Sequence, residues 1–310
     1  MKTRVYIHIT AFLLILYLPC SLIAQQRGGY AGSFLRMGLG ARALAMGGAY
    51  VGLPGDGYSG YYNPAGLPVL QKKEATFSYR MLSLDRSFSY VGYSAPLPPS
   101  AGISVGWIHA GVDNIDGRDF SGNHTEFYDD SQNGFLFAFG LKFNERVSVG
   151  LGATLLRETL VDITAKGMGI NAGVLVRLTD NLTLGGAFRD LGAHYSWNTE
   201  SLFGERGGTT TNDFPVLFTG GAGYYYEKYR TTFIIDIFKN EKSETGYHFG
   251  IENRYSEKLH IRAGLNDGDL AAGVGILFPV SKYVGRMDYT MTDKEYDPEV
   301  THIFSLSIIF

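Results

Sequence analysis

The sequence predicts an all-β protein, a transmembrane antiparallel β-barrel of about 14 strands with an N-terminal, partly helical plug segment. After residue 72, strand-sized stretches carry an apolar side chain at every second position. The links between these stretches alternate between short and long, as short turns and longer loops do on the two sides of an outer-membrane barrel. The printed sequence also ends on an apolar strand whose last residue is aromatic.

Composition agrees with this fold class and excludes one functional class. The 310 residues include 41 Gly, 21 Tyr and 20 Phe but only 10 Pro, a mixture that favours strands and tight turns. Only 18% of the residues are charged, and the formal net charge is −3. No long basic run is present, so we expect no nucleic-acid partner.

The N-terminus has the pattern of a secretory signal peptide, assigned to residues 1–24. Lys2 and Arg4 precede the apolar stretch 11–18, and the small residue Ala24 stands before the expected cleavage site. Cys20 raises the alternative of a lipoprotein, but the residues before it include no suitably placed small one, so lipidation is the minor interpretation. The mature chain would contain no cysteine and must be stable without disulfides.

Residues 25–72 form the predicted plug. We expect a short helix over 41–46 that ends at Gly47 and Gly48, and a second helical start with Asn63 as N-cap and Pro64 in the first position. Small residues let backbone approach backbone, so the segment is suited to folding up into the barrel from the periplasmic side. The motif residues of this plug are Arg42, Met46, Gly47, Gly48, Asn63, Pro64, Ala65 and Gly66.

Two nucleotide-binding interpretations of the same stretch fail. Residues 38–43 fit the pattern G-x-G-x-x-A, but this fingerprint requires a preceding strand, a crossover helix and a downstream acid, none of which is credible here. No Gly-Lys-Ser or Gly-Lys-Thr follows, so a phosphate-binding loop is excluded as well. We therefore predict no cofactor.

Residues 73–310 form the predicted barrel. In the stretch 258–266, Leu259, Ile261, Ala263 and Leu265 occupy one face and polar residues or glycine the other. Further predicted strands include 74–81, 87–95, 134–143 and 246–254. Most stretches match the roughly 9–11 tilted residues that cross a bilayer, and no apolar run after the signal peptide reaches helical spanning length, so only a closed barrel could span.

The links set the orientation of this barrel. The predicted tight links are 143–147, 179–182, 226–229, 255–259 and 279–283, and the two long ones are 111–133 and 191–213. An even strand number would bring both termini to the periplasmic side, where the short turns lie. A soluble β-sandwich would also show alternation and is the alternative fold.

The final ten residues, THIFSLSIIF, resemble a barrel-assembly signal. Phe304, Leu306, Ile308 and Phe310 share one face, as in the terminal strand that the barrel-assembly machinery recognises. In a soluble protein such an apolar strand would be an aggregation hazard.

Many charged residues fall on the predicted inward faces of the strands. They are Lys142, Arg177, Arg189, Arg230, Asp236, His248, Glu252, Arg254, Arg262, Arg286 and Asp288. Buried charges are normally paired, so we expect them to hold barrel and plug together, with Arg36 and Arg42 facing acids such as Glu252 or Asp288. A polar conduit is the alternative.

The two long links carry the candidate docking residues for cargo or ligand. These are Phe120, Phe127 and Tyr128 in the first link, and Tyr195, Trp197 and Phe203 in the second. Exposed aromatics suit partner docking, although they could also belong to an outer aromatic girdle. The first link is also acidic, but its spacing is not that of an EF-hand, so a solvated loop is favoured over a calcium site and we predict no metal.

No catalytic constellation is visible. The seven His residues are scattered, and none is paired with a second His or a carboxylate at metal-ligand spacing on one face. We therefore predict that the chain is not an enzyme. A serine–histidine site assembled at the barrel rim stays open as an alternative, because such sites are defined by geometry rather than by sequence position.

The stretch FLRMGLGARALAMGGAYVG, followed by GYYNPAGL, resembles the N-terminal signature of the PorV/PorQ family, a branch of the FadL-like outer-membrane barrels. The motif covers residues 34–67 only, and GLPGDGYSGYYNP departs from the more acidic, Ala-rich turn expected of the family. The resemblance implies a protein of the outer membrane of a Gram-negative bacterium, in contact with lipid, lipopolysaccharide and the barrel-assembly machinery.

The same resemblance implies two possible functions. The first is a component of the type IX secretion system that docks or shuttles cargo bearing C-terminal signal domains, together with other secretion-system subunits. The second is FadL-like transport of hydrophobic small molecules across the outer membrane. The motif and the charged lumen favour the first modestly.

Overall fold

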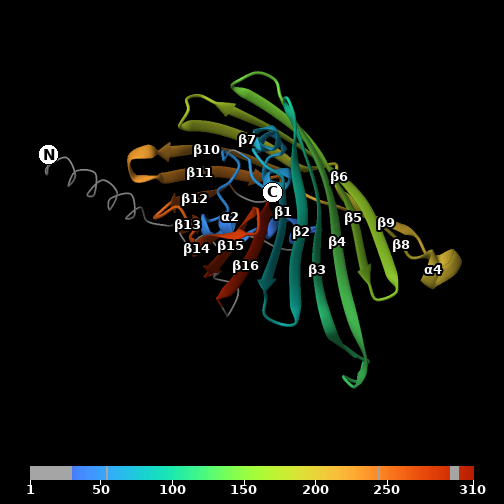
Figure 1. The fold of residues 1–310 in the computed structure, drawn as a ribbon. Coiled ribbons are helices and arrows are strands. Elements are labelled where there is room, and N and C mark those ends of the chain that lie inside the picture. Colours follow the sequence, from blue (N-terminus) through green and yellow to red (C-terminus); the bar gives the residue numbers. More distant parts are fainter. Residues whose placement is uncertain (1–29, 54, 243–244, 294–299) are drawn as a thin grey trace.

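The computed structural model describes residues 30–53, 55–242, 245–293 and 300–310, and within them fourteen antiparallel strands close into a barrel (Figure 1). The strands are β1 (Glu74–Met81), β2 (Arg86–Leu97), β3 (Ala101–Arg118), β4 (His124–Lys142), β5 (Val147–Leu160), β6 (Ile163–Arg177), β7 (Leu182–Leu191), β10 (Leu217–Tyr226), β11 (Thr231–Asn240), β12 (Gly246–Asn253), β13 (Leu259–Asn266), β14 (Asp269–Val280), β15 (Tyr283–Thr292) and β16 (Thr301–Ile309). Pairing of β1 with β16 closes the ring. The predicted fold class is confirmed.

The two ends of the barrel differ. We call the end where β1 begins and β16 ends the inner rim; it carries tight turns, such as those between β4 and β5 and between β14 and β15. We call the opposite end the outer rim. The predicted signal peptide and Cys20 lie outside the described residues, so the cleavage site stays a prediction.

The long link predicted at 111–133 is mostly strand. Pairing of β3 with β4 continues outward to Arg118 and His124, whereas β2 starts opposite Val112. The two strands therefore project beyond their neighbour as a hairpin (Figure 1). The prediction of a loop was wrong because a hairpin with water on both faces keeps its backbone hydrogen bonds but needs no alternation of apolar and polar side chains.

The second prediction of a loop, at 191–213, was also wrong, because the two strands there are only 5 residues long and too short to show a clear alternation. It contains β8 (His194–Asn198) and β9 (Thr209–Asp213), which pair with each other and are joined through α4 (Glu200–Phe203) and η3 (Gly204–Arg206). β8 pairs with the outer part of β6 at Ala165 and Lys166. The chain returns to the barrel only at β10, which pairs with β7.

The predicted outward faces are confirmed. Phe135, Phe137 and Phe139 of β4 are exposed on the outside of the barrel, and Ile261 of β13 is 49% exposed. In β16, Phe304 and Leu306 are exposed while the alternating Ser305 and Ser307 are buried against the lumen. Apolar side chains thus face the position of the lipid and polar ones the interior. No helix within the described residues is long and apolar enough to cross a membrane.

The plug fills the lumen as four short helical turns (Figure 1). They are η1 (Ser33–Arg36), α2 (Ala41–Ala45), α3 (Ser59–Tyr62) and η2 (Pro64–Val69). The expected helix is present and ends at Gly47 and Gly48, both with positive φ. Asn63 caps η2 by accepting a hydrogen bond from the Ala65 N–H, with Pro64 in the first position.

The plug runs from the outer rim to the inner rim. Tyr30, at the start of the described chain, donates a hydrogen bond to the carbonyl of Lys242 in the outer link between β11 and β12. At the other end of the plug, Leu67 packs against Gly102 near the inner turn of β2 and β3. Residues 30–72 therefore descend through the lumen, whereas the sequence was interpreted as folding up from the periplasmic side.

A glycine belt on the inner wall seats this plug. Its members are Gly102, Gly140, Gly150, Gly173, Gly185, Gly250 and Gly264, on strands β3 to β7, β12 and β13. A Cβ at Gly185 would overlap the carbonyl oxygen of Val51, and one at Gly150 would overlap the carbonyl of Pro64. Plug and wall therefore meet backbone to backbone, which leaves little free space between them.

Candidate functional site: two cavities divided by the plug

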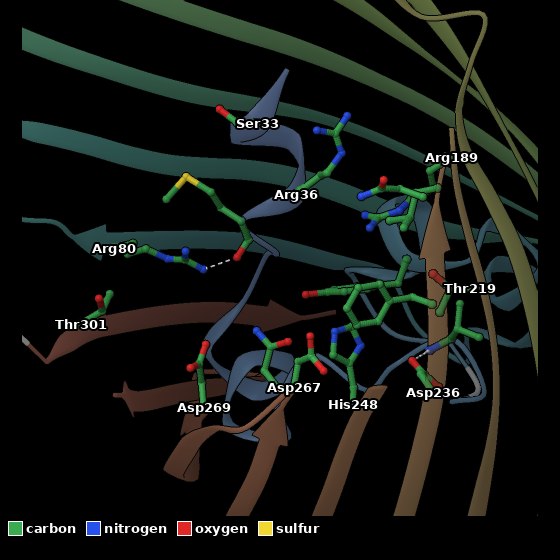
Figure 2. Close-up of a pocket in the computed structure, with 18 of the residues that line it drawn as sticks. Ser33, Arg36, Arg80, Arg189, Thr219, Asp236, His248, Asp267, Asp269 and Thr301 are labelled. Atoms are coloured by element: carbon green, nitrogen blue, oxygen red, sulfur yellow. Dashed lines mark hydrogen bonds between the residues drawn. The ribbon is translucent and has the colours of Figure 1, made fainter. Parts of the chain in front are cut away.

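An outer cavity of about 450 Å³ lies between the plug and the outer halves of the strands (Figure 2). Its apolar lining comes from Met37, Val51, Leu82, Leu217 and Phe238. The volume falls in the range of small-molecule sites, which are typically apolar with a few well-placed polar groups. The cavity can therefore accept a small hydrophobic molecule.

Four arginines line the same cavity, and we call three of them the outer arginines: Arg36 of the plug, Arg80 of β1 and Arg189 of β7 (Figure 2). The fourth, Arg86 of β2, donates hydrogen bonds to Ser83. None of the three forms a salt bridge with any residue that the structure describes. Buried N–H groups without a hydrogen-bond partner in this part of the chain are Arg36 Nε, Arg80 Nε and Nη1, and Arg189 Nη1. Guanidinium groups bind carboxylates and phosphates well, so these free donors define an anion-binding wall.

The contacts that these arginines make with carbonyl oxygens and aromatic rings hold them in place. Arg80 Nη2 donates to the Met37 carbonyl oxygen at 2.6 Å, and its guanidinium lies 5.3 Å from the centre of the Phe88 ring. Arg189 lies over the Tyr61 ring at 4.5 Å. Burial lowers the pKa of Arg36, as expected for a cation that has lost water and gained few partners. The buried Asp190 interacts electrostatically with Arg36 and Arg189, so the outer arginines are oriented and only partly compensated.

Asp236 on the opposite wall holds the plug. Its Oδ2 accepts hydrogen bonds from the backbone N–H groups of Tyr50 and Val51 at 2.7 and 3.0 Å. The side chain is almost fully buried, and Figure 2 shows it at the edge of the cavity. Asp236 therefore fixes the part of the plug that forms the cavity floor.

An inner cavity of about 490 Å³ opens at the other side of the plug. It is lined by Leu53, Leu70 and Tyr225 together with the charged groups Arg42, Asp56 and Arg286. The two cavities share no lining residue. Val51 borders the outer cavity and Leu53 the inner one, so the plug segment at 51–53 separates them.

Below the outer cavity, a buried ion network joins the plug to the wall. Its members are Arg42, Arg262 and Arg286 with Asp56, Glu74, Glu252 and Asp288. Arg42 pairs with Glu252 at 2.8 Å and with Asp56 at 3.0 Å, and Arg262 joins Glu252 to Asp288 at 2.7 Å each. Arg286 contacts Glu74 at 2.5 Å and Asp288 at 3.2 Å.

The network confirms the predicted pairing with an inward-facing acid for one of the two plug arginines, Arg42, but not for Arg36. Burial by itself lowers the pKa of Arg42, but Glu252, Tyr50 and Asp56 together outweigh this and keep the pKa above its usual value. The predicted pairing of Arg42 with Glu252 is present. Arg36 pairs with neither Glu252 nor Asp288, because it lies in the outer cavity above them.

Several of the predicted inward charges take no part in the network. Arg177 and Arg254 are exposed at the inner rim, and Arg230 pairs with the exposed Glu257. Lys142 is half-buried at the inner end of β4. These residues lie too close to the strand ends to face the plug. Sequence reasoning missed Arg80, although its position between the outward-facing Tyr79 and Met81 was a usable signal.

The remaining motif residues of the plug contact the wall directly. Met46 and Gly47 lie against Gly250 and Gly264 of the glycine belt. Asn63 Nδ2 donates to the carbonyl oxygens of Val51 and Val174 at 2.9 and 3.0 Å, linking plug to β6. The predicted motif residues Pro64, Ala65 and Gly66 are buried around it.

The candidate docking aromatics divide into two groups. Phe120 and Phe127 are exposed on the projecting hairpin, with Tyr128 half-buried beside them, and Phe203 is exposed on α4. Tyr195 is only 1% exposed and packs against Phe214, with ring centres 5.0 Å apart, while Trp197 is half-buried next to it. Tyr195 is therefore part of the interior and not a surface residue.

Comparison with known proteins shows which solved structures share this fold. No family model matches the sequence, and no curated protein matches it. The CymD monoaromatic hydrocarbon channel shares the fold with a TM-score of 0.64 and 13% identity over 88% of this chain and 97% of that one. The toluene transporter TbuX of Ralstonia pickettii has a TM-score of 0.61 at 13% identity, with the same coverage.

A FadL homologue of Pseudomonas aeruginosa is also similar, with a TM-score of 0.59 and 12% identity over 87% of this chain and 97% of that one. The chain thus has the fold of FadL-type outer-membrane barrels. At this level of identity the likeness shows the fold alone, so the expectation of a non-enzyme stays a prediction. The PorV/PorQ assignment is finer than this likeness and stays a prediction.

Proposed function

We propose that this chain is an outer-membrane transporter that captures hydrophobic small molecules bearing one anionic group in its outer cavity. The observation that carries the proposal is the set of three outer arginines, with unpartnered N–H groups, in a cavity that also has apolar residues in its wall. The aspartates of the same wall are Asp236, which holds the plug, and Asp267 and Asp269. A FadL-type fold supports the transport function. The mature chain would lie in the outer membrane of a Gram-negative bacterium after removal of its signal peptide.

The energetics favour an anionic group over a plain hydrocarbon. A buried charge without a partner is costly, so binding a carboxylate to the outer arginines gains Coulombic energy while their donors become satisfied. TbuX is described as a toluene transporter and CymD as a monoaromatic hydrocarbon channel, which supports the hydrophobic part of the ligand. The outer arginines add the requirement for negative charge.

Passage beyond the outer cavity requires a rearrangement. The plug segment at 51–53 separates the two cavities, and the glycine belt and the ion network hold the plug against the wall. A captured molecule therefore continues only if this segment moves or if the molecule leaves between strands.

The experiment compares two molecules that differ in charge. Initial rates of uptake of radiolabelled decanoate and decanol are measured in cells that express the barrel and lack their own FadL-type proteins. Replacing Arg80 with Met should reduce decanoate uptake by about tenfold or more, because a hydrogen bond to a charged group contributes roughly 1.5–3 kcal/mol. Decanol uptake should change little.

The matched control is Arg157→Met, which removes an exposed arginine at the outer end of β5 that does not line the cavity. This variant should transport both molecules as the wild type does. Equal losses for decanoate and decanol in the Arg80 variant, or no uptake of either by the wild type, would contradict the proposal.

A second candidate function is docking of secreted cargo, favoured by the hairpin of β3 and β4. Phe120 is fully exposed at its tip and Phe127 is 63% exposed, although both are large apolar side chains. The variant Phe120→Ser/Phe127→Ser should then reduce the amount of cargo proteins with shared C-terminal domains outside the cell, and these proteins should accumulate in the periplasm. Phe143→Ser, which removes an exposed phenylalanine at the inner rim, serves as the control, and an unchanged secreted proteome would count against this function.

A further inference from the structure

The two rims of the barrel carry opposite charge. From β4 onward, each inner link has a basic residue within it or beside it: Arg146, Arg177, Lys228, Arg254, Lys258 and Lys282. Glu145, Asp180, Glu227 and Glu257 in the same links offset part of this charge, and Arg230 adds to it, so the net charge of these links stays positive. At the outer rim, carboxylates dominate the projecting hairpin, where Asp113, Asp116 and Asp119 lie close together in sequence. The molecule is therefore electrostatically polarised along the barrel axis, with its positive end at the inner rim.

Lys228 at this rim lies over an exposed aromatic group, and we call Lys228, Tyr224, Tyr226 and Tyr229 the β10 cluster. The Lys228 Nζ lies 5.3 Å from the centre of the Tyr229 ring. Tyr229 in turn contacts Tyr226 edge to face, with ring centres 5.3 Å apart, and Tyr226 stacks with Tyr224. Tyr229 is 59% exposed, and Tyr224 and Tyr226 are exposed on the outward face of β10.

Lys282 repeats this arrangement in a second cluster, the β15 cluster. Its Nζ lies 5.2 Å from the centre of the Tyr283 ring, and Tyr283 packs edge to face against Phe310 at 4.9 Å. Farther along the wall, Met287 of β15 pairs with Leu306 of β16, and both are exposed outward. Lys228 and Lys282 are exposed and form no salt bridge with any described residue.

Both clusters combine the parts that a phospholipid requires. Exposed tyrosines on a barrel wall mark the level where hydrocarbon meets the headgroups, and a lysine at that level extends its ammonium group into the headgroup layer. An ammonium group attracts a phosphate as a point charge, while the aromatic rings and the apolar strip beside them can contact the acyl chains. An acidic protein partner would need none of the lipid-facing rings.

We propose that the β10 and β15 clusters are two binding sites for anionic phospholipid headgroups, in the leaflet that surrounds the inner rim. Lys228 and Lys282 bind the phosphate and the tyrosines pack against the upper acyl chains. The acidic outer rim repels the same headgroup, so binding is confined to one side of the membrane. The sites are independent of the proposed transport function and would stand if that function failed.

The test reconstitutes the full-length mature barrel in nanodiscs with equal parts of phosphatidylglycerol and phosphatidylcholine, and native mass spectrometry counts the lipids retained after detergent release. The wild type should retain phosphatidylglycerol preferentially. The variant Lys228→Gln/Lys282→Gln should lower this preference by about fivefold for each lysine, the factor expected of one basic side chain at an anionic surface.

The control variant, Lys166→Gln/Lys239→Gln, removes the same charge from exposed lysines in the outer halves of β6 and β11. It should keep the wild-type preference. Free glycerol phosphate, added in excess, should not displace the retained lipid, because it lacks the acyl chains. Equal retention of the two lipids by the wild type, an equal loss in both variants, or displacement by glycerol phosphate would overturn the proposal.

Discussion

Two groups of three arginines, each with one member in the plug and two in the barrel wall, lie in the lumen and differ in their partners. In the ion network, each guanidinium contacts two carboxylates within 3.2 Å. In the outer cavity, none of the outer arginines forms a salt bridge with a described residue. The same residue type therefore joins plug to wall through salt bridges in one place and has no salt bridge to a described residue in the other.

The largest expected difference in the free energy of unfolding is between two variants that each remove one arginine, one from the ion network and one from the outer cavity. Replacing Arg262 with Met leaves Glu252 and Asp288 without their shared partner and should lower the free energy of unfolding by about 3–5 kcal/mol. Arg80→Met should change it by less than about 1 kcal/mol, because the lost hydrogen bond to Met37 is offset by relief of an unpaired buried charge. Urea unfolding in lipid vesicles measures both, and similar losses would remove the distinction between the groups.

A smaller effect on the free energy of unfolding tests whether close backbone contact with the glycine belt, in addition to the ion network, holds the plug. Gly185→Ala places a Cβ onto the carbonyl oxygen of Val51 and should cost about 1–3 kcal/mol through overpacking. The adjacent Gly186→Ala is the control, since its Cβ would meet only Val174 Cγ1, at 3.4 Å. Unfolding of the two variants under the same conditions should differ accordingly. If both behaved alike, the glycine belt would not be what seats the plug.

The smallest effect concerns an ion pair that is short but exposed. Arg230 and Glu257 lie 2.6 Å apart, closer than most pairs of the network, yet the Glu257 side chain is 85% exposed. Because water screens such a pair, Glu257→Gln should change the free energy of unfolding by less than about 1 kcal/mol. A loss as large as that of Arg262→Met would show that distance rather than burial sets the strength of these pairs.

Much of the barrel follows from local patterns. The outward positions of Ile261, Phe304 and Leu306 were predictable because lipid on one side and a polar lumen on the other impose alternation on each strand. The capped start at Asn63 and the helix end at Gly47 were predictable because they depend only on neighbouring backbone. The extension of β3 and β4 was not, since pairing in water leaves no such pattern.

The candidate site was predictable only in part. The pairing of Arg42 with Glu252 could be anticipated from a basic plug and acidic inward positions. The isolation of Arg36 could not, because it depends on the direction in which the plug traverses the lumen. The glycine belt was also hidden, since its members are far apart in sequence and share only their contact with the plug.

The amino-acid sequence by itself therefore determined the strands, their lipid-facing sides and the presence of a small-residue segment ahead of them, because these depend on interactions within a few residues or with the solvent. Only the tertiary structure decided which charges are paired and where the cavities lie. Salt bridges and cavities depend on distances between residues that the closed barrel and its plug bring together, such as Arg42 and Glu252, which are separated by 210 positions.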